Sequence, residues 1–81
     1  MKKIIEKIKS KDLTVAIVKN GEKFQTVYLH KLLSGKWQST VCSDFVKVSD
    51  DSDSSIIKAL NAIGAPAEFN TEESARKFIG A

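Results

Sequence analysis

The chain is poor in the residues that build most metal and catalytic centres. It has one cysteine, Cys42, and one histidine, His30, among 81 residues. A single cysteine excludes an internal disulfide, and this pair leaves too few ligands for a structural zinc site. No apolar run approaches the roughly 18 residues of a membrane-spanning helix, and no apolar segment follows the lysine-rich start as in a signal peptide. We therefore expect a cytoplasmic protein without cofactor, metal or membrane partner.

The composition of the chain is that of one small globular domain, which we expect to span residues 1–81. Hydrophobic residues make up 42% of the chain and charged residues 28%, which is ordinary for a folded protein. Residues 1–48 carry ten lysines against four acidic residues, a net charge of +6, whereas residues 49–81 carry a net charge of −3. Such asymmetry is typical of proteins that bind nucleic acid or an acidic partner. The basic half contains no arginine, which argues against sequence-specific reading of bases.

Local patterns predict a helix followed by three strands. Residues 2–10 place Ile4, Ile5 and Ile8 in one stripe at helical spacing, with lysines opposite. Residues 13–48 then change to strand-like patterns that are interrupted at Asn20-Gly21 and Ser34-Gly35, two pairs typical of two-residue hairpin turns. The strands are expected over residues 13–18, 22–33 and 36–48.

The last third of the chain predicts two helices after an acidic linker. A cap at Asp53 or Ser54 starts the first helix, which carries apolar residues to Ile63. Residues 67–69 form a short connector or edge strand. Asn70 caps the last helix, over about residues 71–79.

The two turns set the register of the predicted meander, and both select the same face. That face collects Leu13, Val15, Ile17, Phe24, Tyr28, Leu32, Trp37, Val41 and Phe45. Because four of the six aromatic residues are among them, we expect the helices to cover this face. The expected fold class is α+β: a three-stranded antiparallel β-meander with an N-terminal helix and two C-terminal helices packed on one face.

The opposite, open sheet face is the first candidate binding surface. Its polar rim and small aliphatic centre are typical of a protein interface, and its lysines and glutamines also suit a nucleic-acid groove. The candidate residues are Lys23, Gln25, Val27, Leu29, Lys31, Lys36, Gln38 and Thr40. The same patch suits a homodimer, or a solvated face without a binding role. The second candidate is the acidic linker, with Asp50, Asp51 and Asp53 directed to a basic partner.

The sequence contains no arrangement of residues that is typical of a catalytic site. His30 and Cys42 are expected on opposite faces of the sheet, so they do not form a base and a nucleophile. Asp50, Asp51 and Asp53 lack the glycine and the distal glutamate of a calcium loop. No glycine-rich phosphate-binding loop is present. We expect the protein not to be an enzyme.

The opening Ile4-Ile5-Glu6-Lys7-Ile8-Lys9-Ser10-Lys11-Asp12-Leu13-Thr14-Val15 resembles the start of certain small phage anti-CRISPR proteins, which are similar in length and expected layout. The resemblance implies a phage-encoded, non-enzymatic inhibitor that binds a bacterial nuclease in the host cytoplasm. Members that mimic DNA are strongly acidic, whereas this chain carries +3. The layout also resembles double-stranded RNA-binding domains. Acidic residues and serines, among them Asp51 and Ser54, stand here where that family has phosphate-contacting lysines.

The first functional expectation is thus a regulator or inhibitor that docks on another protein. The alternative is a nucleic-acid-binding domain that uses the lysine- and glutamine-bearing sheet face.

Overall fold

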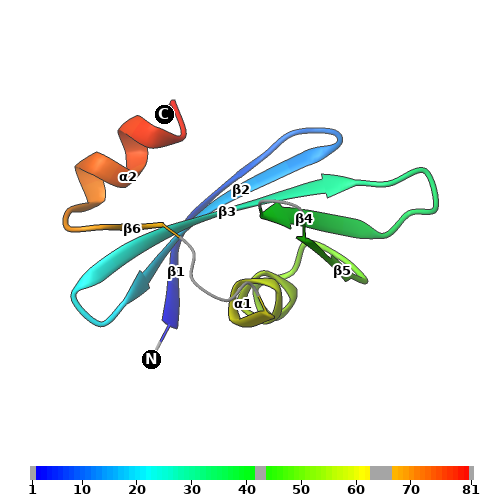
Figure 1. Ribbon diagram of the computed structural model, residues 1–81. Helices are drawn as coiled ribbons and strands as arrows, with labels where there is room; N and C mark the ends of the chain where they lie inside the picture. The colour runs from blue at the N-terminus through cyan, green and yellow to red at the C-terminus, as the bar shows by residue number, and fades with distance from the viewer. Residues whose placement is uncertain (1, 42–43, 63–66, 81) are drawn as a thin grey trace.

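A computed structural model describes residues 2–41, 44–62 and 67–80. It is one antiparallel sheet with a helix against each face (Figure 1). The strands are β1 (Lys2–Lys9), β2 (Leu13–Asn20), β3 (Lys23–Lys31), β4 (Trp37–Val41) and β5 (Asp44–Val48), with the two-residue β6 (Glu68–Phe69) paired to β3; the helices are α1 (Asp53–Ala62) and α2 (Glu72–Phe78). Strands β1 to β5 neighbour one another in chain order. Neither helix, as far as these residues are described, is long and apolar enough to cross a membrane.

The expected fold class is wrong in three respects. The first element is a strand rather than a helix, the meander has five strands rather than three, and the two helices lie on opposite faces of the sheet (Figure 1). We call the face against α1 the inner face and the opposite one the outer face.

A β-bulge explains why β1 has the spacing of a helix. Ile4 pairs with Val18, but the register then shifts, and Glu6 pairs with Ile17. The extra residue, Ile5, changes the phase of the alternation, because a bulge places two residues opposite one. Ile4 therefore lies on the inner face and Ile8, which pairs with Val15, on the outer face. The i, i+1, i+4 pattern arises from a strand with a break in its alternation.

The β2–β3 turn lies one residue later than predicted. Asn20 pairs with Lys23, so the loop is Gly21-Glu22, and Gly21 has the positive φ of +65° that a tight hairpin needs at this position. The pairing thus differs from the prediction by two residues, with Ile17 opposite Thr26. Because side chains alternate with a period of two, this shift leaves every residue of β2 and β3 on its predicted face.

The β3–β4 loop, by contrast, reverses the predicted faces of the next strand. The Leu32 N–H donates to the Lys36 carbonyl (2.7 Å) and closes a three-residue loop, in which Gly35 takes a φ of +93°. Three-residue hairpins commonly hold such a residue at their last position. The loop was predicted to have two residues, and the additional one turns Trp37 to the inner face, where it is buried opposite Val48.

The predicted third strand, 36–48, is in fact the hairpin β4–β5. Val41 pairs with Asp44 and Trp37 with Val48, so the chain reverses between Val41 and Asp44. The inner face of the hairpin carries Val46 and Val48, which pack toward α1. The sheet thereby curves around the helix (Figure 1).

The main core lies on the inner face, not on the aromatic face where it was predicted. Its buried residues are Ala16, Val18, Val27, Leu29, Trp37, Val48, Ile56, Ala59 and Leu60. Small aliphatic side chains on β2 and β3 allow α1 to approach the sheet closely. The prediction assumed one buried face, but β2 is buried on both faces, from Thr14 to Val18. Six consecutive residues of low polarity, 13–18, are the pattern of such a strand.

The helix α1 agrees with the prediction, apart from its cap. Ser52 rather than Asp53 or Ser54 closes its first turn: the Ser52 carbonyl accepts from the Ile56 N–H at 2.9 Å, and the Ser52 Oγ accepts from the Ser55 N–H at 3.3 Å. The predicted end of this helix at Ile63 lies outside the described residues.

Candidate functional site

The structure separates the eight residues that were predicted to form one open sheet face. Gln25, Val27 and Leu29 are only 4%, 2% and 0% exposed, because they lie on the inner face, where Val27 and Leu29 belong to the core that α1 closes. These three residues are therefore not part of an open face, and the aliphatic centre that was predicted to bind a partner or a second copy is buried. Lys23, Lys31 and Lys36 are exposed at strand ends and in a loop, and Gln38 is half-buried on the outer face. The Thr40 side chain lies outside the described part of the chain.

The acidic linker contacts the protein's own first two strands. The Asp51 Oδ2 accepts a hydrogen bond from the buried Thr14 hydroxyl at 2.8 Å and lies 3.2 Å from the Lys9 Nζ. The Asp53 Oδ1 lies 3.1 Å from the Lys7 Nζ. Burial alone would raise the pKa of the Asp51 carboxyl, but the hydrogen bonds from Thr14 and Lys9 hold it below its ordinary value.

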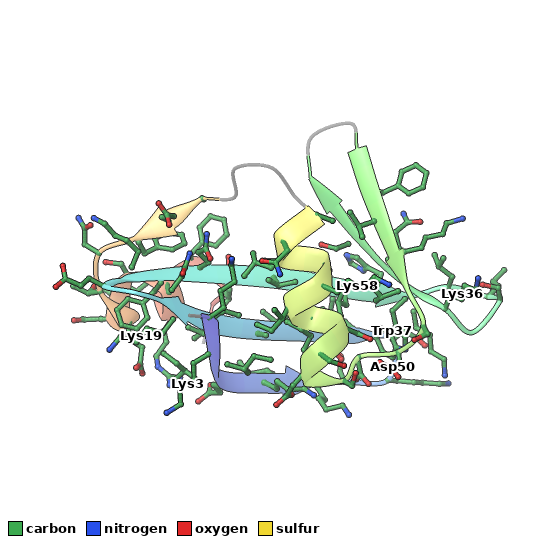
Figure 2. All side chains as sticks on the ribbon, turned by 90° about the horizontal axis from the view of Figure 1, so that it is seen from below. Lys3, Lys19, Lys36, Trp37, Asp50 and Lys58 are labelled. Carbon is green, nitrogen blue, oxygen red and sulfur yellow. The ribbon has the colours of Figure 1, made fainter. Side chains whose placement is uncertain are left out.

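Asp50 completes the connection between the sheet and α1, beside the start of the helix (Figure 2). Its Oδ1 accepts hydrogen bonds from the hydroxyls of Ser52 and Ser55, both at 2.6 Å. These bonds to the charged form lower the pKa of Asp50 to about 2. The acidic linker therefore stabilises the start of α1 and pairs with lysines of β1. Some of the opposite charges of the two halves of the sequence thus neutralise one another within the fold.

α2 covers one end of the outer face. Arg76 donates to Glu6 of β1 and to Glu72 of its own helix, both at 2.8 Å, and Ile17 and Ala75 are fully buried. The Arg76 hydrogen bond and charge lower the pKa of Glu6.

The C-terminal end of α2 is only partly packed on the sheet. Phe78 lies 5.1 Å from Phe69, measured between ring centroids, yet it is 57% exposed. The helix is capped by Thr71, whose Oγ1 accepts from the Ser74 N–H, rather than by the predicted Asn70.

The other end of the outer face has no described helix over it (Figure 1). We call this surface the open outer face and define it by Ile8, Tyr28, His30, Gln38, Phe45 and Lys47. Three of its polar residues form one row, since His30 pairs with Gln38 and Gln38 with Lys47. Tyr28 and Phe45 come two residues before His30 on β3 and two residues before Lys47 on β5, and they lie on the same face because side chains alternate along a strand.

Phe45 is the least expected side chain of this surface. It is 58% exposed, and the Lys47 Nζ lies 5.7 Å from its ring centroid, at the distance of a cation–π contact. None of the six defining residues is acidic, whereas Asp50, Asp51 and Asp53 lie on the α1 side of the sheet. An exposed aromatic ring beside a cation and two polar side chains is suited to a partner that carries flat rings and negative charge.

Sequence reasoning missed the open outer face because it placed Phe45 and Tyr28 in the core. The residues 45–47 do carry a hint, since an aromatic and a lysine alternate onto one face of the same strand. That alternation is more typical of a half-solvated face than of a core.

A cleft beside α1 and the placement of metal-ligating residue types concern other kinds of site. An open cleft of about 560 Å³ lies between the start of β1 and the first turn of α1, lined by Lys2, Lys3, Ile4, Asp53, Ser54 and Ile57. Lysines and the Asp53 carboxylate, which Lys7 already pairs, line it together, so the cleft has no uniform charge. Among the described residues no group of three or more His, Cys, Asp or Glu gathers as metal ligands.

Comparisons with protein-family models, curated proteins and solved structures find no match to this chain. The resemblance to small anti-CRISPR proteins stays an expectation. The layout that supported it began with a helix over residues 2–10, and this segment contains the strand β1.

Proposed function

We propose that the protein is not an enzyme and binds nucleic acid through its open outer face. The observation that carries the proposal is Phe45, more than half exposed beside Lys47 at the end of the outer face that no described helix covers. Aromatic rings on an open sheet, next to cations, are the means by which many proteins hold nucleic acid.

The charges of the surface favour a polyanion. Lys47 lies on the open outer face, and Lys36 is exposed in the loop that enters β4 (Figure 2). Lysine contacts phosphate as a point charge and carries no sequence information. With no arginine before Arg76, which is bonded to Glu6 and Glu72, binding should tolerate many sequences.

Docking on another protein, the first expectation from the sequence, is the second candidate. The acidic linker supports it less than expected, because Asp51 and Asp53 are engaged with Thr14, Lys9 and Lys7. The observation in its favour is Leu33, which is fully exposed in the β3–β4 loop. A partner protein would bury this side chain, and Leu33→Asp is the variant that would weaken such a complex.

The test is a charge reversal on the open outer face. We expect the wild-type protein to bind a fluorescein-labelled mixture of oligonucleotides, measured by fluorescence anisotropy, more weakly at 200 mM than at 50 mM salt. Lys47→Glu should reduce affinity on the order of tenfold, because a phosphate contact becomes a repulsion. Lys58→Glu is the matched control: it makes the same change in net charge on α1, on the inner side (Figure 2), and should bind like the wild type.

Equal losses in the two variants would show that net charge, not the open outer face, causes the binding. No binding to any polynucleotide at 50 mM salt would overturn the proposal and leave protein docking.

A further inference from the structure

We infer that the nucleic acid held by the open outer face is single-stranded and that Phe45 and Tyr28 each stack on a base. The inference rests on the proposed function and adds to it that the bound nucleic acid is single-stranded. It derives from the position of the two rings, the curvature of the sheet and the polar row beside the rings.

The Phe45 ring is exposed on the open outer face. A phenylalanine ring normally contributes to a core, but this ring points away from the α1 core, to which its neighbours Val46 and Val48 contribute. Its described ring contact is Lys47, a flexible side chain. When a phosphate attracts the ammonium group, the ring face becomes available for a base, since stacking on aromatic side chains is open to every base type.

The open outer face is also curved. The sheet bends around α1, and the open outer face is on its convex side (Figure 1). A duplex keeps its base faces stacked inside and offers phosphates and groove edges to such a surface. A single strand can turn individual bases outward onto the rings. The convex, aromatic surface therefore matches a single strand better than a duplex.

Polar side chains form a row beside the two rings. β3 and β5 are two strand spacings apart, about 10 Å, so Tyr28 and Phe45 have room for two separate bases. His30, Gln38 and Lys47 lie in the adjacent row and provide hydrogen-bonding groups and charge for the sugar-phosphate backbone. These groups are equally suited to DNA and RNA, so both are included in the test.

The experiment tests the preference for single-stranded over duplex nucleic acid separately from the contribution of each aromatic ring. Affinities for oligo-dT, oligo-rU and a duplex of equal length are measured by anisotropy at 50 mM salt, with folding of each variant checked by circular dichroism. We expect at least one single strand to bind about tenfold more tightly than the duplex. Phe45→Ala should weaken single-strand binding about 5- to 150-fold, the range for losing one stacked base.

Phe78→Ala is the matched control, because Phe78 is equally exposed but lies on α2, at the covered end of the sheet. It should bind like the wild type, and Tyr28→Leu should weaken single-strand binding in the same direction as Phe45→Ala. If the duplex binds as tightly and Phe45→Ala has no effect, while Lys47→Glu still weakens binding, the inference is overturned and the proposed function stands. If no nucleic acid binds at all, both fail. Equal losses in the Phe45 and Phe78 variants would also overturn the inference.

Discussion

Leu29→Ala should lower the free energy of unfolding by about 2–5 kcal/mol, the range for large-to-small changes in a packed core. Leu29 is completely buried on β3, and α1 closes the inner face above it with Ile56 and Leu60. Truncation leaves a cavity between sheet and helix that neither can fill without moving. Urea denaturation, followed by the fluorescence of the single tryptophan, Trp37, measures the loss.

The control for Leu29→Ala lies on the outer face. Ile8 is 41% exposed, so Ile8→Ala should cost no more than about 1 kcal/mol because it gives up little buried area. A larger loss in Ile8→Ala than in Leu29→Ala would mean that the core lies on the aromatic face, as the sequence had predicted.

Asp51→Ala should lower the free energy of unfolding by about 1–3 kcal/mol, because it leaves the buried Thr14 hydroxyl without its acceptor. Most of the effect should come from Thr14 and not from the ion pair, since Lys9 is more than half exposed and such pairs contribute little. Asp51→Asn keeps an oxygen for Thr14 and should lose less. A loss below about 0.5 kcal/mol in Asp51→Ala, the range of ordinary surface changes, would contradict the role given to this hydrogen bond.

The same linker makes stability sensitive to acid. The pKa values of Asp50 and Asp51 are lower in the folded protein than the ordinary value of 3.8. Their stabilisation is therefore present above about pH 4 and is lost as the pH falls through the folded values, which for Asp50 is about 2. Urea midpoints at pH 6 and pH 2.5 should differ less in Asp51→Ala than in the wild type.

The sequence predicted the C-terminal elements and the alternation of the central strands. α1, α2 and the strand β6 were expected close to where they lie, because caps and apolar spacing are local properties. The side-chain alternation of β2 and β3 was also correct, since a two-residue shift of register does not change it. These features depend on short stretches of chain and on backbone geometry.

The errors have two physical sources. A single added residue reverses a face, and this happened at Ile5, in the bulge, and in the loop closed by Leu32 and Lys36. The second source is tertiary: which face a helix covers depends on where the chain goes after β5. The candidate surface was missed for that reason, since Phe45 was assigned to a core that lies on the other side of the sheet.

Nuclear magnetic resonance shows directly whether the open outer face is the surface that binds nucleic acid. Titration of the ¹⁵N-labelled protein with oligo-dT or oligo-rU should shift the amide resonances of Tyr28, His30, Gln38, Phe45 and Lys47. Those of α1, from Ser55 to Ala62, should stay in place. Shifts concentrated on α1 and the β1 cleft, or no shifts at saturating oligonucleotide, would contradict the account.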